Sequence, residues 1–135
     1  MPLSGAPLYR TLWMGGAVHI DATHPFDETA RLLSHALAVA FVKDVEGKYE
    51  EFPAFTARAA GLEFVLLGIP LPEYDLRDHA DNTYELQVHS DGSVFPADSV
   101  EADRFHAVEL SEFYARFIQS ATGIACSAQE YPGAA

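Results

Sequence analysis

The chain has 135 residues, 49% of them apolar, and its 20 acidic and eight basic residues give a formal charge of −12 at pH 7. That length and apolar content predict a folded domain with a core rather than a disordered acidic tail. The negative electrostatic field of such a chain repels nucleic acid and anionic membranes and favours basic proteins as partners. The competing interpretation is that the acidic surface serves solubility alone.

Features that the sequence lacks narrow the possible classes of protein further. The single cysteine, Cys126, excludes an internal disulfide framework and a zinc site built from several cysteines. Residues 1–16 lack a basic region followed by a long apolar run, so no signal peptide is expected. The longest apolar stretch, 37–42, is too short to cross a membrane. We therefore expect a soluble, cytoplasmic protein that does not associate with membranes.

The N-terminal part predicts extended structure after a loose start at residues 1–7. Two β-forming runs, 8–14 and 17–21, flank Gly15 and Gly16. Two strands joined by a Gly-Gly turn form a hairpin, which is the interpretation we favour. The alternative is one long strand with a glycine bulge.

The next segment predicts a helix from about residue 25 to 43. Pro25 suits the first helical position, and apolar residues recur at three- to four-residue spacing. The expected buried stripe consists of Phe26, Ala30, Leu33, Leu37 and Phe41. A short second helix is expected after Pro53, with Gly61 as its C-terminal cap.

The middle of the chain predicts strands. Residues 62–69 are apolar on both faces, as in a central strand. Residues 83–95 alternate between apolar and polar side chains around Asp91-Gly92, which predicts a hairpin. A further strand is expected over 104–110.

A final helix is expected to begin with Ser111 as its N-cap and to end at Gly123. Its predicted buried stripe consists of Leu110, Phe113, Tyr114, Phe117, Ile118 and Ala121. Residues 127–135 are expected to form a loose tail. Residues 1–135 are thus predicted to form a single α+β domain, a mostly antiparallel sheet with two main helices and one short helix packed on one face.

The stretch AVHIDATHPFDE places His19, Asp21 and His24 within six residues. On a strand His19 and Asp21 share a face, and His24 lies near the following helix, so the geometry allows a metal site. However, H-x-D-x-x-H matches no familiar zinc spacing, and the passage from a strand to a helix explains the same residues. We therefore expect no metal and no cofactor.

Catalytic motifs are missing as well. The chain has no G-x-S-x-G elbow, dinucleotide-binding loop or Walker loop, and Cys126 has no basic neighbour to lower its thiol pKa. We therefore expect no enzyme activity. The alternative is a small hydrolase, with or without a metal, that uses some of His19, Asp21, His24, His89 and His106.

Two acidic segments mix carboxylates with tyrosines and are the predicted partner-binding residues. The first segment contributes Asp44, Glu46, Tyr49, Glu50 and Glu51. The second contributes Glu73, Tyr74, Asp75, Asp78, Asp81, Tyr84 and Glu85. Tyrosine provides contact area at low entropic cost, and carboxylates steer a basic partner. The alternative is that both segments are merely solvated loops.

Size, charge and helix–sheet order, with LEFVLLGIP before an acidic loop and a closing helix ELSEFYARFIQSATG, resemble the bacterial toxin immunity proteins. That class shares no diagnostic motif, so the resemblance assigns no role to a single residue. It implies tight stoichiometric binding to a basic toxin domain, often a nuclease, whose active site is blocked. The second alternative is an oligomeric scaffold or adaptor, and the oligomeric state is left open.

Overall fold

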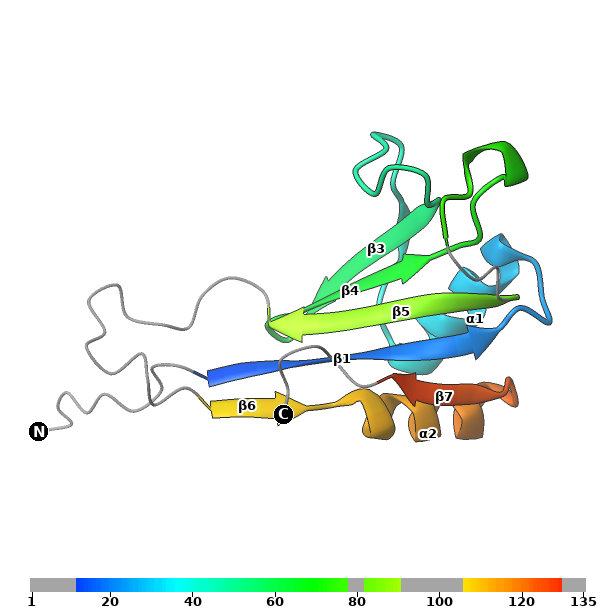
Figure 1. The fold of residues 1–135 in the computed structure, drawn as a ribbon. Helices are drawn as coiled ribbons and strands as arrows, with labels where there is room; N and C mark the ends of the chain where they lie inside the picture. Colours follow the sequence, from blue (N-terminus) through cyan, green and yellow to red (C-terminus); the bar gives the residue numbers. More distant parts are fainter. Residues whose placement is uncertain (1–11, 78–81, 91–105, 130–135) are drawn as a thin grey trace, which may run out of the picture.

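The computed structural model describes residues 12–77, 82–90 and 106–129, which form a mostly antiparallel sheet with two α-helices (Figure 1). The elements in chain order are β1 (Leu12–Asp21), α1 (Phe26–Leu37), β2 (Val42–Lys43), β3 (Ala54–Ala59), β4 (Leu62–Leu67), a 3-10 turn (Pro72–Tyr74), β5 (Thr83–Ser90), β6 (His106–Glu109), α2 (Ser111–Thr122) and β7 (Cys126–Gln129). The predicted α+β class is confirmed.

The sheet is arranged around β1, its longest strand. The strand order is β2-β3-β4-β5-β1-β6, and β7 also pairs with β1. One edge of β1 is shared: β6 runs parallel to Leu12–Gly15, and β7 runs antiparallel to Ala17–Ile20. Helix α2 connects these two strands, so its N-terminus lies against β1 between them.

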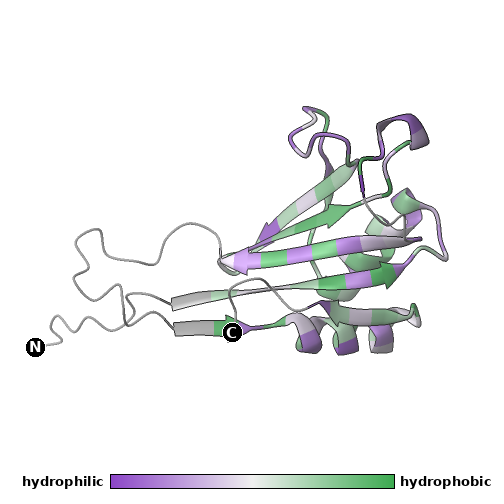
Figure 2. Cartoon of the chain, in the orientation of Figure 1, coloured by the Kyte–Doolittle hydropathy of each residue, from purple (hydrophilic) through white to green (hydrophobic). Residues whose placement is uncertain are grey.

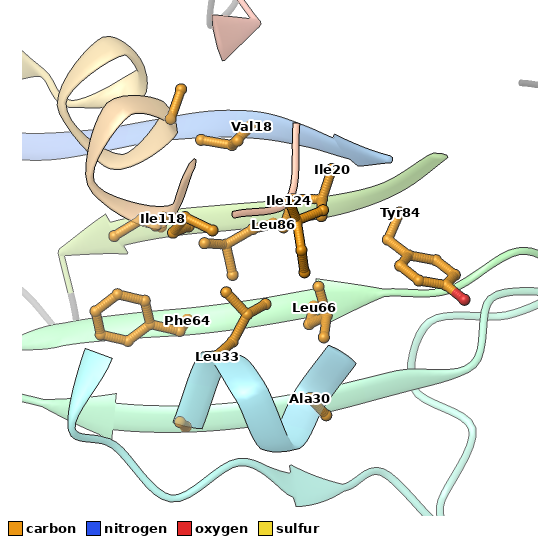
Figure 3. Close-up of a cluster of buried hydrophobic side chains, with 13 residues drawn as sticks. Val18, Ile20, Ala30, Leu33, Phe64, Leu66, Tyr84, Leu86, Ile118 and Ile124 are labelled. Atoms are coloured by element: carbon orange, nitrogen blue, oxygen red, sulfur yellow. The ribbon is translucent and has the colours of Figure 1, made fainter. Parts of the chain in front are cut away.

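Both helices pack on the same face of the sheet. Val18, Leu86 and Leu66 point from three neighbouring strands toward Leu33 of α1 and Ile118 of α2 (Figure 3). All five side chains are at most 1% exposed. The alternation of apolar and polar residues along β5 separates this core face from the opposite, more polar face (Figure 2).

The Gly15-Gly16 pair does not form a turn. Its residues face His89 and Val88, and the register with β5 continues without a shift to Asp21. The predicted hairpin is therefore wrong. The alternative is confirmed in its single long strand, Leu12–Asp21, but not in its glycine bulge. Glycine permits a turn but does not require one. Here hydrogen bonding on both edges of β1 keeps the backbone extended.

The predicted short helix after Pro53 is also wrong, because residues 54–59 form β3. Ala60 and Gly61 both have positive φ, +54° and +79°, and they join β3 directly to β4. Two central residues with positive φ form the turn that suits a two-residue hairpin. Gly61 therefore closes a hairpin rather than capping a helix.

Helix α1 begins as predicted but ends at Leu37, six residues earlier than 43. Ala38 adopts the left-handed conformation, and its N–H bonds to the carbonyls of His35 and Ser34. Ala30 and Leu33 form the fully buried part of its stripe. The chain then leaves the helix and pairs as β2 with β3.

Helix α2 buries only part of the stripe predicted for it, because Ile118 is fully buried and Tyr114 packs against the core, but other predicted residues are exposed. Ser111, Ala115 and Ile118 are buried, whereas Phe113 and Phe117 are 58% and 40% exposed and stack on each other. Leu110 rather than Ser111 is the N-cap, and the Ser111 hydroxyl instead accepts a hydrogen bond from the N–H of Ala17. Gly123 ends the helix, as predicted.

The C-terminal segment continues as a strand beyond this helix. Residues 126–129 form β7, so the expectation of a loose tail is wrong for 127–129. Strands β4, β5 and β6 lie within the three ranges predicted for them. The predicted turn at Asp91-Gly92, the loose start at 1–7 and the tail residues 130–135 lie outside the described residues.

Candidate functional site

The two predicted acidic segments meet at one end of the sheet. The loop between β2 and β3 and the loop after β4 project side by side beyond these strands (Figure 1). Together they surround a surface depression of about 440 Å³, which we call the acidic hollow. It is lined by Glu50, Glu51, Glu73, Tyr74 and Leu76.

The first loop presents its carboxylates because its own residues hold it in place. The Asp44 carboxylate accepts hydrogen bonds from the backbone N–H groups of Glu46 and Lys48. Tyr49 and Phe52 pack against a small apolar cluster on the polar face of the sheet. Tyr49 is thus anchored at the start of the turn, and the next two residues line the hollow.

The second loop is tied to the first through the backbone. The N–H of Gly68 donates to the carbonyl of Pro53 at 2.8 Å. Pro72 then begins the 3-10 turn, since its fixed φ suits the first position of a helical turn. That turn leaves Leu71, Tyr74 and Leu76 60%, 59% and 79% exposed.

The charge of the hollow is unbalanced. Its lining includes three carboxylates and no lysine or arginine. Within residues 12–77, 82–90 and 106–129, none of Glu50, Glu51 and Glu73 forms an ion pair. Exposed apolar side chains therefore lie beside uncompensated negative charge, a combination that suits contact with a basic and partly apolar surface.

Asp75, also predicted for partner binding, has an internal role instead. Its two carboxylate oxygens accept hydrogen bonds from Arg77 at 2.9 and 2.8 Å, and both side chains are largely shielded from solvent. These bonds lower the pKa of Asp75 to about 2. Its charge is already matched within the chain, so it does not add to the unbalanced charge of the hollow.

This pair predicts a specific acid sensitivity. Because the folded-state pKa lies below the ordinary value of 3.8, the ionised Asp75 stabilises the fold above about pH 4, and this contribution is lost as the pH falls toward 2. Urea unfolding should show Asp75→Asn less stable than the wild type at about pH 6, with the gap narrowing toward pH 2. A gap that is independent of pH would contradict this assignment.

Three other predicted residues do not line the acidic hollow. Asp44 closes a turn through its side chain, and Glu46 lies 3.9 Å from the ammonium of Lys48. Tyr84 is only 6% exposed, and its hydroxyl donates to the carbonyl of His24 at 2.7 Å, so it belongs to the core. Asp78 and Asp81 lie outside the described residues.

Glu85, the remaining predicted residue, lines a second depression of about 220 Å³, which we call the sheet-face cavity. Its lining consists of His19, Phe52, Leu67, Gly68, Arg77, Thr83 and Glu85. His19 faces Glu85 directly in the pairing of β1 with β5, so the two side chains lie on the same face of the sheet. No local pattern predicts this cavity, because the pairing joins segments more than 60 residues apart.

His19, Asp21 and His24 do not form one site. His19 lines the cavity, Asp21 is exposed, and the ring of His24 lies 3.1 Å from the hydroxyl of Thr23. Among the described residues there is no group of three or more histidine, cysteine, aspartate or glutamate side chains that could hold a metal ion.

The contacts of the other candidate catalytic groups are those of structural residues. His89 lies 3.4 Å from Glu63, which also lies 3.7 Å from Arg58. Burial raises the pKa of the Cys126 thiol to about 11, which keeps it protonated and weakly nucleophilic. The side chain of His106 is outside the described part.

Comparison with known proteins adds no relationship. No protein-family model matches the chain, and no curated protein matches it. Within the described residues, neither helix is long and apolar enough to cross a membrane.

Proposed function

We propose that this chain is an acidic cytoplasmic protein that binds a basic partner at the acidic hollow and neutralises it, as an immunity protein neutralises its toxin. The observation that carries the proposal is the meeting of the two acidic loops. Glu50 and Glu51 from one loop and Glu73 from the other surround a depression beside exposed apolar side chains.

The composition of this surface supports protein binding over solvation alone. Carboxylates that serve solubility need no apolar neighbours, yet Tyr74 and Leu76 line the same hollow and Leu71 is exposed nearby. Exposed tyrosine and leucine side chains supply the hydrophobic contact of an interface once a partner covers them. The carboxylates around them accelerate the encounter with a positively charged partner.

A basic toxin domain fits this surface best. A nuclease has a cationic groove that binds phosphates, and clustered carboxylates can occupy the same positions. Inhibition then requires only that the complex cover the groove, so no catalytic residue is needed on the inhibitor. One molecule would neutralise one toxin domain.

The proposal is tested by capture followed by expression. The immobilised protein is incubated with an extract of its source cell at low salt, and the partner is identified after elution at high salt. We expect this partner to arrest growth when expressed alone and to be harmless when expressed with the protein. A captured partner that is harmless alone, or that stays toxic in the presence of the protein, would overturn the proposal.

A further inference from the structure

The sheet-face cavity lies next to the acidic hollow along both loops. Phe52, in its wall, directly follows Glu51 of the hollow, and Arg77 directly follows Leu76. A partner segment seated on the hollow is therefore within reach of the cavity. The residues that line the cavity then determine which chemical group of the partner it can accept.

The polar wall of the cavity favours a cation. Glu85 is half-buried, and within the described ranges its only polar side-chain partner is Gln87, which donates to one carboxylate oxygen at 2.9 Å. Within the described residues this carboxylate forms no ion pair, so it is available to a cation that enters the cavity. Arg77 also lines the cavity, and its guanidinium donates two hydrogen bonds to the carboxylate of Asp75.

The same wall provides the acceptors that an ammonium group needs. An ammonium group has three donors. The second oxygen of Glu85, a ring nitrogen of His19 and the hydroxyl of Thr83 can accept from them. Phe52 and Leu67 add an apolar wall that suits a chain of methylene groups.

We propose that the sheet-face cavity receives a lysine side chain of the basic partner, with its ammonium against Glu85 and its methylene stem against Phe52 and Leu67. Lysine fits better than arginine because Gln87 occupies one Glu85 oxygen, and arginine favours carboxylates with two free oxygens. This inference rests on the proposed function, and it adds the residue type that anchors the partner.

The first test uses the free chain and a small probe. Nα-acetyl-lysine-N-methylamide is titrated while backbone and histidine-ring NMR signals are followed. We expect saturable shifts at His19, Thr83 and Glu85, and none with the Nε-acetylated probe, which lacks the ammonium. An unshifted cavity in the wild-type chain would overturn the inference without any variant having to fold.

The second test uses the partner identified by capture. Glu85→Gln should weaken its binding at least tenfold, which corresponds to the loss of one charge-assisted hydrogen bond. Glu63→Gln is the matched control, because Glu63 lies on the same sheet face but pairs with His89 and does not line the cavity. Circular dichroism checks that both variants fold.

The outcomes separate this inference from the proposed function. If Glu85→Gln binds the partner normally while charge reversal in the acidic hollow weakens binding, the lysine site is wrong and the proposed function stands. If neither change weakens binding, both are wrong. Equal losses for Glu85→Gln and Glu63→Gln would also overturn the lysine site, because a general charge effect would explain them.

Discussion

Reversing the three carboxylates of the acidic hollow, by Glu50→Lys, Glu51→Lys and Glu73→Lys, should weaken binding of the partner about 100-fold. Each carboxylate contributes about 1 kcal/mol to a contact with a basic surface at the rim of an interface, and a loss of about 3 kcal/mol corresponds to roughly two orders of magnitude. Glu50 and Glu73 are exposed, so the fold should tolerate the change. Surface plasmon resonance would measure the association rate and the affinity.

The control for this variant must carry the same net charge. Each reversal raises the formal charge by two, so three reversals change it from −12 to −6. Asp21→Lys, Asp27→Lys and Glu112→Lys reverse three exposed carboxylates that do not line the hollow. If this control loses as much affinity as the hollow variant, overall charge rather than the hollow attracts the partner.

Gly16→Ala should produce the largest loss of stability. A Cβ atom at Gly16 would lie 2.5 Å from the backbone nitrogen of Ser111 and 2.6 Å from its hydroxyl oxygen. To relieve this steric clash, α2 must move away from β1. That movement breaks two hydrogen bonds, one from the N–H of Leu110 to the carbonyl of Gly15 and one from the N–H of Ala17 to the hydroxyl of Ser111. Overpacking and two lost hydrogen bonds together amount to about 3–5 kcal/mol of unfolding free energy.

Gly47→Ala is the matched control for that substitution. Nothing lies within 4 Å of the Cβ position at Gly47, but its φ is +70°, so only backbone strain is expected, about 1 kcal/mol. Urea unfolding of both variants measures the difference. Equal losses of unfolding free energy in the two variants would mean that the close approach of α2 to β1 does not restrict the side chain at position 16.

Elements with decisive local signals could be predicted from the sequence. The apolar run of β4, the alternation of β5 and the glycine after α2 each specify structure without help from distant residues. The Gly15-Gly16 pair shows the limit. Its conformation depends on partners supplied by β5, β6 and α2, all of which are distant in the sequence.

The buried face of α2 shows a second limit. Hydropathy places Phe113 and Phe117 in the buried stripe, yet both are exposed, and the smaller Ser111 and Ala115 are buried beside Ile118. The helix lies so close to β1 that only small residues fit at its first turns, as the contact with Gly16 shows. The distance between two elements is a tertiary property, which a local periodicity does not contain.

The acidic hollow was predicted in its parts but not as a whole. Glu50, Glu51, Glu73 and Tyr74 were among the predicted residues, whereas Leu76 was missed. In the sequence Leu76 is an apolar residue between two charged ones. This pattern also occurs in buried strands, so it does not by itself indicate an exposed side chain. The ion pair of Asp75 with Arg77 could not be predicted, since it forms only in the folded turn.

The acidic hollow is the proposed binding site of the partner. Hydrogen–deuterium exchange of the free chain and of the complex tests it most directly. We predict slower exchange in the complex for backbone amides of residues 48–52 and 71–77, with α2 unchanged. Protection confined to α2 around Phe113 and Phe117, with both hollow loops exchanging as in the free chain, would contradict the claim.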